Sequence, residues 1–523
     1  MKSEISVVNN HVSKKPIMWS ISGADCSGGA GIAADIKTGH NLGVEVCHLI
    51  TANTVQNSSV FYSVNPTAVD ILAQQAQALR FDKPPAVIKI GLIADDEQIH
   101  WLILLLSQLK SELPNLLVVF DPVCKASVGG NMSLFSTGAL SLLMPLIDVI
   151  TPNLNEAKAL SSLASKNSVI KAKEMAENVL HLGCKAVIVK GGHASAENTS
   201  QDKHCIDVCL QNLSATSTQL FTLHSPKINT SYSHGGGCSF ASALASFLAH
   251  SYLLRDAFTL TKAFINQGLL LATDRVDHQI NNSDYYGAFQ QGLWPTKASV
   301  FPQVISPVYQ QLESPQGFKS FELAANEKLG LYPVVDSLSW LALLLPQNLK
   351  IIQLRIKSDD INYVAPLIEK AVAMARNFNC RLFINDHWQL AIKYGAYGVH
   401  IGQEDLHGAD LNAIANAGLR LGISTHGCYE FLLAKQLRPS YLAIGAIFPT
   451  KTKNMTGQIQ GIKNLTQILS LADTIPVVAI GGINQQRLKQ VWSTGVSAIA
   501  VVTAITQAQQ PLSATKTMQA MLG

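Results

Sequence analysis

Carboxylate, cationic and hydroxyl side chains recur in the second half of this 523-residue chain, directly after short apolar runs. The carboxylates in such positions include Asp386 and Asp405. The accompanying cations are Arg355, Lys357, Lys451 and Lys453. Carboxylate oxygens suit a divalent metal ion, cations neutralise phosphate charge, and Gly482 lets backbone N–H groups approach an anion. These residue types indicate a Mg2+-dependent enzyme that handles a diphosphate and a second phosphate.

Eight short apolar runs precede these residues and are candidate strands. They cover 331–335, 351–354, 381–384, 398–401, 420–423, 441–444, 476–480 and 498–502. Between two of them, apolar residues from Val364 to Ala375 follow the i, i+3, i+4, i+7 spacing of an amphipathic helix. Eight strand–helix units at this spacing predict a (β/α)8 TIM barrel, whose functional residues lie at the carboxyl ends of the strands.

Two glycine-rich turns in the first half are candidate ligand sites. Residues 23–31 (GADCSGGAG) follow a candidate strand and lead into a helix that carries Asp35. Residues 234–238 (HGGGC) open a helix rich in Ala, Ser and Leu at 239–248. Three glycines before a helix expose N–H groups that suit a transferring phosphoryl group, and the alternative is a tight structural loop. Cys238 there has a lowered pKa if it is exposed, or else is a small buried residue.

The elements around these turns alternate as in a parallel sheet. Candidate strands cover 17–22, 86–90, 117–121, 148–151 and 186–190. Helical patterns such as that of residues 69–79 intervene, which predicts a mostly parallel sheet with helices on both faces. Prolines then crowd into residues 292–328, where periodicity is lost. We therefore expect domains at 14–291 and 329–523, joined by a linker at 292–328.

The composition narrows the class of protein. With 47% hydrophobic and 14% charged residues, the chain is too apolar for a disordered polymer. Lys+Arg 39 against Asp+Glu 35 leaves a net charge of +4 without basic runs, so no nucleic-acid partner is expected. No apolar stretch approaches the roughly 18 residues of a membrane span, and the N-terminus lacks a secretory apolar core. Nine cysteines without a CxxC pair indicate reduced thiols, so we expect a cytoplasmic enzyme.

The second half carries eight motifs in the order LGLYPVVDS, QLRIK, LFINDHW, YGVHIGQEDL, LGISTH, AIFPTKTK, VAIGGI and IAVVTAIT. Across about residues 329–511 this series closely resembles the thiamine-phosphate synthase family. The resemblance implies that this half joins hydroxymethylpyrimidine diphosphate to thiazole phosphate and releases pyrophosphate. The family is thought to pass through a pyrimidine-methyl cation, so no side-chain nucleophile is expected.

The same resemblance assigns residues to the ligands of this half. It implies Mg2+ ligation by Asp386 and Asp405, and catalytic positions for Ser424 and Lys453. The expected contacts of the pyrimidine diphosphate are Gln353, Leu354, Arg355, Ile356, Lys357, Asn385, Ser424 and Lys453. The expected contacts of the thiazole phosphate are Thr450, Lys451, Thr452, Gly482, Val502 and Thr503.

The first half carries, in order, the motifs SGADCSGGAGIAADIKT, TANTVQN, VIKIGL, VFDPV, TPNLNEA, VKGGH and HGGGC. Over about residues 17–250 they resemble the hydroxymethylpyrimidine (phosphate) kinase branch of the ribokinase-like family. The resemblance implies a ribokinase-like three-layer α/β/α domain in which ATP phosphorylates the pyrimidine twice. All expected partners are therefore small-molecule substrates. Ribokinase-like proteins are often dimers, so a homodimer stays open.

This second resemblance implies three groups of residues in the kinase half. The expected pyrimidine contacts are Gly23, Asp35 and Gln56. The expected ATP and Mg2+ region contains Asp121, Asn153, Glu156, Lys190, Gly235 and Gly237. Cys238 stands at the position of the family's proposed base.

The kinase motifs depart from the family pattern at three positions. Gly236 replaces a threonine, and Leu92 replaces a methionine. Ser127 stands where a lysine is expected, with Lys125 nearby. The favoured hypothesis is a bifunctional enzyme in which the kinase half makes the diphosphate that the barrel consumes. The departures leave open an N-terminal half that binds the pyrimidine without catalysis, and a sugar or pyridoxal kinase is a third alternative that the order of motifs disfavours.

Overall fold

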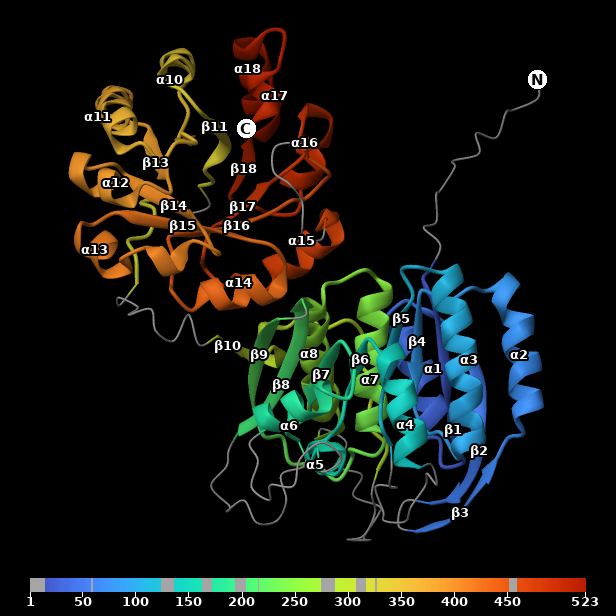
Figure 1. The fold of residues 1–523 in the computed structure, drawn as a ribbon. Coiled ribbons are helices and arrows are strands. Elements are labelled where there is room, and N and C mark those ends of the chain that lie inside the picture. The colour runs from blue at the N-terminus through green and yellow to red at the C-terminus, as the bar shows by residue number, and fades with distance from the viewer. Residues whose placement is uncertain are drawn as a thin grey trace, which may run out of the picture. The chain divides into compact units, whose positions relative to one another are not determined.

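The computed structural model describes residues 15–57, 60–123, 136–161, 172–192, 204–214, 216–273, 287–306, 317–324, 327–450 and 459–523. The chain divides into two compact units, Met1–Pro295 and Thr296–Gly523 (Figure 1). The domain and linker boundaries expected from the sequence stay predictions. Within the described ranges, no helix is long and apolar enough to cross a membrane.

The first unit is built around an open sheet. Its strands are β1 (Ile17–Asp25), β2 (Glu45–Gln56), β3 (Phe61–Pro66), β4 (Val87–Ile90), β5 (Leu117–Phe120), β6 (Val149–Ile150), β7 (Ala186–Val189), β8 (His204–Ser214) and β9 (Ser217–Pro226). Its helices are α1 (Gly31–Asn41), α2 (Val69–Asp82), α3 (Asp96–Glu112), α4 (Thr137–Leu143), η1 (Met144–Leu146), α5 (Leu154–Ser161), α6 (Ala172–Leu180), α7 (Gly236–Ala249) and α8 (Leu254–Thr273).

The strands of this unit lie in the order β9-β8-β7-β6-β5-β4-β1-β2-β3. Neighbours from β7 to β2 pair in parallel, whereas β3, β8 and β9 join through antiparallel pairs. Helix α7 contacts both α1 and α8 in one layer, and α3 contacts both α2 and α4 in the other (Figure 1). Because both faces are covered, β4 and β7 are buried along their whole length. The three-layer α/β/α prediction is confirmed.

The second unit contains a closed barrel of parallel strands. They are β11 (Gly330–Val335), β12 (Ile351–Leu354), β13 (Arg381–Asn385), β14 (Gly398–Gly402), β15 (Arg420–Thr425), β16 (Tyr441–Ile444), β17 (Val477–Ile480) and β18 (Ala498–Val501). The longer helices are α10 (Leu338–Leu344), α11 (Ile361–Asn377), α12 (Trp388–Tyr394), α13 (Leu411–Asn416), α14 (Cys428–Lys435), α15 (Gly461–Leu469), α16 (Gln485–Trp492), α17 (Thr503–Thr506) and α18 (Pro511–Leu522). Shorter elements are η2 (Ala298–Val300), β10 (Gln303–Ile305), η3 (Leu345–Gln347) and η4 (Leu406–Gly408). The predicted TIM barrel is confirmed.

Aromatic side chains fill the interior of the barrel. Tyr332, Phe383 and Tyr441 are buried there, with ring centroids 5.2 Å apart between Phe383 and Tyr441. Phe321, from the stretch expected as a linker, packs against the same rings with its centroid 6.0 Å from that of Phe383. A barrel filled in this way is not a pore, so ligands are expected at the ends of its strands.

Candidate active sites in the two units

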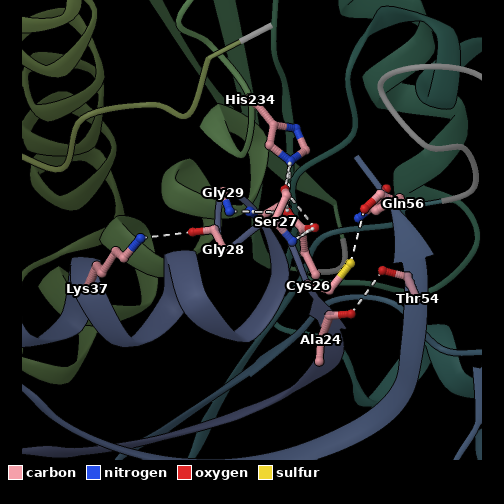
Figure 2. A network of polar contacts seen from close by, with 11 residues as sticks. Ala24, Cys26, Ser27, Gly28, Gly29, Lys37, Thr54, Gln56 and His234 are labelled. Carbon is pink, nitrogen blue, oxygen red and sulfur yellow. Dashed lines mark hydrogen bonds and ion pairs between the residues drawn. The ribbon is translucent and has the colours of Figure 1, made fainter. Parts of the chain in front are cut away.

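The two glycine-rich turns of the first unit lie against each other. Asp25, at the end of β1, accepts hydrogen bonds from the backbone N–H groups of Ser27 and Ala30, both at 2.9 Å. Its Oδ2 also lies 2.8 Å from Nε2 of His234, which precedes α7. Figure 2 shows the His234 ring pointing into the turn at Ser27 and Gly29. Burial alone would raise the pKa of Asp25, but hydrogen bonds from His234, Ser27 and Ala30 hold it well below its usual range.

Glycine is required where the two turns touch. Gly235 has a φ of +79°, and a Cβ there would lie only 1.8 Å from the carbonyl oxygen of Gly29. A Cβ on Gly29 would in turn lie 2.2 Å from the His234 ring. Gly236 differs, because nothing lies within 4 Å of a Cβ added there. The threonine that the family carries at this position would therefore have room.

Four residues predicted for the ATP and Mg2+ region come together at the carboxyl ends of β5, β6 and β7. Lys190 donates to Oδ1 of Asp121 at 2.9 Å. Asn153 and Glu156 cap α5 reciprocally: the Glu156 N–H donates to Asn153 Oδ1 at 2.9 Å, and the Asn153 N–H donates to Glu156 Oε2 at 2.8 Å. Burial raises the pKa of Glu156 to about 7, with Lys190 opposing the rise and Asp121 adding to it. A further cation beside Glu156 would favour its ionised form.

The start of α7 lies beside this cluster. A Cβ on Gly237 would lie 3.6 Å from Lys190 Nζ and 4.0 Å from Asp121 Oδ2. Burial raises the pKa of Cys238, the next residue, to about 11, although the Lys89 charge lowers it. The lowered pKa expected for an exposed thiol is therefore not found here, because Cys238 is half-buried and burial together with Asp121 outweighs the charge of Lys89.

Asp35, a predicted pyrimidine contact, takes part in a fully buried ion pair. Lys89 donates to its Oδ2 at 2.8 Å, and both side chains are 0% exposed. Ser20 donates to the same oxygen at 2.5 Å, and Ser242 donates to Oδ1 at 2.6 Å. Both carboxylate oxygens are thus engaged by the protein. A direct contact between Asp35 and the pyrimidine stays a prediction.

The other predicted pyrimidine contacts lie around the first turn. A Cβ on Gly23 would lie 2.6 Å from Cδ2 of Leu92, so the family departure at Leu92 packs directly on this glycine. Gln56 is buried at the end of β2, and its carbonyl oxygen lies 3.0 Å from Sγ of Cys26 (Figure 2). Lys125 and Ser127, the remaining departure, lie outside the described residues.

A pocket of about 310 Å3 opens at the carboxyl ends of β12 and β13 in the second unit. Its lining residues are Arg355, Ile356, Lys357, Ser358, Asp359, Asn385, Asp386 and His387. Five of these were predicted from the sequence as diphosphate or metal contacts. Gln353 and Leu354 lie within β12 and are buried. The pocket combines cations with a carboxylate, which suits a diphosphate accompanied by a metal ion.

The carboxylate pair Asp386 and Asp405, which follows β13 and β14, fits a divalent cation. Burial raises the pKa of Asp386, the nearby charge of Asp405 raises it further, and Arg355 lowers it. Two hard oxygen ligands that destabilise each other's charge in this way suit Mg2+. Within the described ranges, no group of three or more His, Cys, Asp or Glu side chains could hold a metal ion.

The predicted thiazole-phosphate residues that the structure describes lie after β16, β17 and β18. Gly482 has a φ of +64°, and a Cβ there would lie 2.5 Å from the carbonyl oxygen of Pro449. Val502 precedes α17, and Thr503 begins it. Thr450 is the last described residue of the loop after β16. The predicted residues that lie outside the described part are Lys451, Thr452 and Lys453.

Sequence reasoning did not single out several residues that the structure places in these sites. Asp25 and His234 stood inside the quoted motifs, but only the fold brings them together. Lys89 could have been recognised from the sequence, because a cation within an apolar run such as VIKI is rare in a buried strand. His400 is likewise a polar residue among the apolar residues of β14, and its Nε2 lies 2.7 Å from Oγ of Ser424.

The fold and the two sites define a two-domain α/β enzyme that acts on phosphorylated small molecules. The family model for phosphomethylpyrimidine kinase matches residues 25–282, and the model for thiamine monophosphate synthase matches residues 331–505. The chain therefore belongs to the thiamine-phosphate synthase family through its second unit and carries a phosphomethylpyrimidine kinase domain in its first.

Several proteins are similar to one part of this chain or the other. Thiamine-phosphate synthase of Yersinia pestis (strain Pestoides F) is 53% identical over 192 residues, which are 37% of this chain and 87% of the relative. The enzyme of the same name from Photorhabdus laumondii is 53% identical over 184 residues, 35% of this chain and 85% of the relative. The solved phosphomethylpyrimidine kinase of Clostridium difficile is 28% identical, covers 48% of this chain and 99% of its own, and has a TM-score of 0.38.

Proposed function

We propose that this chain converts an unphosphorylated pyrimidine into thiamine phosphate through both of its units. The first unit phosphorylates 4-amino-5-hydroxymethyl-2-methylpyrimidine with ATP to the monophosphate and then to the diphosphate. The second unit condenses the diphosphate with thiazole phosphate and releases pyrophosphate. The observation that carries the proposal is the pocket of cations and carboxylates in the barrel, on a chain that also carries a kinase domain. The product of one unit is the substrate of the other.

In the first unit, the start of α7 and Lys190 are assigned to the transferring phosphoryl group. The N–H groups of Gly235 and Gly237 and the Lys190 ammonium would neutralise charge that develops on the phosphoryl oxygens. The Asp121, Asn153 and Glu156 cluster would hold the Mg2+ that accompanies ATP. Gly23, Asp35 and Gln56 are assigned to the pyrimidine side.

Cys238 is assigned to remove the proton of the substrate hydroxyl. Because burial raises its pKa to about 11, only a small fraction is thiolate at neutral pH. That fraction is a strong base, and the Lys89 charge favours it. The rate of phosphoryl transfer is therefore expected to rise with pH above neutrality.

In the second unit, Arg355, Lys357 and Lys453 are assigned to neutralise the diphosphate, with Asn385 and Ser424 as hydrogen-bond partners. Mg2+ on Asp386 and Asp405 would supply further neutralisation of the departing charge. The bond between the methyl carbon of the pyrimidine and the diphosphate oxygen breaks, and its electron pair leaves with the diphosphate. The thiazole nitrogen then forms a bond to that carbon. The residues assigned to the thiazole phosphate are Thr450, Lys451, Thr452, Gly482, Val502 and Thr503.

The test incubates the protein with thiazole phosphate and Mg2+, adding either ATP and the free pyrimidine or the pyrimidine diphosphate alone. Wild-type protein is expected to make thiamine phosphate in both mixtures. Lys190→Met should do so only from the diphosphate, and Asp386→Asn should instead accumulate pyrimidine diphosphate from ATP. Product from the diphosphate alone in the wild type would reduce the first unit to a pyrimidine-binding module. No product in either mixture would overturn the proposal.

A further inference from the structure

A continuous chain of hydrogen bonds crosses the interior of the barrel between two residues of the proposed diphosphate site. Gln353 Nε2 lies 3.3 Å from Tyr332 Oη, which lies 2.9 Å from Tyr441 Oη. Tyr441 Oη lies 2.7 Å from Nδ1 of His400, and His400 Nε2 lies 2.7 Å from Oγ of Ser424. The first four of these side chains are buried, and Ser424 is half-buried. Ser424 is therefore the most accessible member of this chain.

Strand register builds the central contact of this chain. His400 on β14 is in register with Gly422 on β15, and Gly422 is in register with Tyr441 on β16. A Cβ on Gly422 would lie 2.1 Å from the Tyr441 ring and 2.5 Å from its Oη. The missing side chain on the middle strand leaves the space in which His400 and Tyr441 meet. Their rings stack there with an interplanar angle of 19°.

Gln353 donates at one end of this chain, because an amide nitrogen can only donate. Tyr332 can pass its own proton on to Tyr441, and Tyr441 can in turn donate to Nδ1 of His400. Burial raises the pKa of both tyrosines well above their usual values, so both phenol protons are present at neutral pH. An imidazole that accepts at Nδ1 in this way carries its proton on Nε2 and can donate it to Ser424.

We infer that His400 and Tyr441 are positioning residues that hold Ser424 as a hydrogen-bond donor toward the diphosphate. Ser424 Oγ already accepts from His400, so its own proton must go to another acceptor. The oxygens of an ionised diphosphate can only accept, so this polarity matches the leaving group. The inference rests on the function proposed for the barrel and adds to it residues that lie behind the substrate contacts.

The test compares two variants that each remove one buried phenol hydroxyl. In Tyr332→Phe, Tyr441 still donates to His400, so Ser424 keeps its orientation. In Tyr441→Phe, the imidazole is free to move its proton to Nδ1, and Ser424 can then turn its proton to His400 instead of the diphosphate. We expect kcat of the synthase reaction to fall about tenfold in Tyr441→Phe, the size of one hydrogen bond to a charged group. It should change by no more than about twofold in Tyr332→Phe, and KM for thiazole phosphate should change in neither.

A double-mutant cycle with Ser424→Ala separates positioning from general destabilisation. If Tyr441 acts through Ser424, Tyr441→Phe should cause no further loss of kcat in the Ser424→Ala background. Equal losses in Tyr332→Phe and Tyr441→Phe, or additive losses in the double variant, would overturn the inference. Thermal unfolding of both variants checks that the two hydroxyl deletions cost similar stability.

A measurement independent of activity separates this inference from the proposed function. The 15N resonances of His400, assigned by their loss in His400→Gln, should show a neutral ring with its proton on Nε2. A proton on Nδ1 would overturn the inference even in an active enzyme. A wild type that makes no product from the pyrimidine diphosphate, while its His400 carries the Nε2 proton, would instead overturn the proposed function of the barrel.

Discussion

Nε2 of His234 lies 2.8 Å from Oδ2 of Asp25, and this contact joins residues that are 209 positions apart in the chain. It holds the carboxyl end of β1, an interior strand of the sheet, against the start of α7. Gly235 and Gly29 allow the close approach, because a side chain on either would collide with the opposite turn. The proposed phosphoryl site therefore depends on a contact that neither turn makes alone.

Asp25→Asn should lower the free energy of unfolding of the first unit by about 1–3 kcal/mol at pH 7, because it removes the charged acceptor of several hydrogen bonds. The folded-state pKa of Asp25 lies well below the ordinary value of 3.8. Its contribution to stability is therefore complete above about pH 4 and is lost as the pH falls below that value. Urea unfolding from pH 3 to pH 7 measures the effect. Asp70→Asn, on the exposed start of α2, is the control, and equal losses in both variants at pH 7 would contradict the prediction.

Gly235→Ala and Gly236→Ala should have opposite effects on stability. The alanine at 235 meets the Gly29 carbonyl oxygen in a left-handed conformation, so a loss of at least about 2 kcal/mol is expected. The alanine at 236 enters open space in the first turn of α7, so a gain of about 0.5–1 kcal/mol is expected. Chemical unfolding of the two variants measures both effects, and a destabilising Gly236→Ala would show that the space is absent.

Lys89→Met should destabilise the first unit by about 3–5 kcal/mol, because it leaves the buried carboxylate of Asp35 without its ion-pair partner. Adding Asp35→Leu should restore part of this loss, since the unpaired charge is then gone. Lys173→Met serves as the control, because Lys173 pairs with Glu177 at 3.6 Å on an exposed helix face and should matter by less than about 0.5 kcal/mol. A double variant less stable than Lys89→Met would contradict the account.

Alkylation of Cys238 by iodoacetamide should be slow at pH 7 and accelerate toward a midpoint near its pKa of about 11. The exposed Cys26 would compete, so the experiment uses a Cys26→Ser background and identifies the labelled peptide by mass. Removing the Lys89 charge should raise the pKa of Cys238 further and slow labelling at a given pH. Rapid labelling at pH 7 would show an exposed thiolate instead.

Asp386→Asn should weaken Mg2+ binding to the barrel in the presence of pyrophosphate by at least about tenfold, since it removes one of two proposed ligands. Because the pKa of Asp386 is raised, protons compete with the metal, and the wild-type affinity should fall as the pH falls through that raised value. Calorimetric titration measures both effects. Asp359→Asn removes a carboxylate from the same pocket and should have a much smaller effect. Equal losses in the two variants would indicate a general charge effect without a defined ligand pair.

Local sequence patterns predicted most strands of the parallel core and all those of the barrel. Buried parallel strands are short apolar runs in the sequence, and amphipathic helices separate them. Each strand could therefore be predicted without knowing which strands pair with it. The antiparallel strands β3, β8 and β9 were not predicted. They mix polar residues with apolar ones, such as Gln211, Asn212 and Ser214 in β8, because they lie toward the edges of the sheet.

The sequence by itself determined the two fold classes, the families and which residue types stand at the strand ends, because these depend on periodicity and motif order along the chain. Only the tertiary structure decided how the buried polar groups pair. Asp35 on α1 pairs with Lys89 on β4 through helix–sheet packing, and His400 meets Tyr441 through strand register, neither of which any local pattern encodes. It also decided the pKa of Cys238, since burial and the charges of Asp121 and Asp35 outweigh the charge of Lys89, and all three charges come from distant segments of the chain.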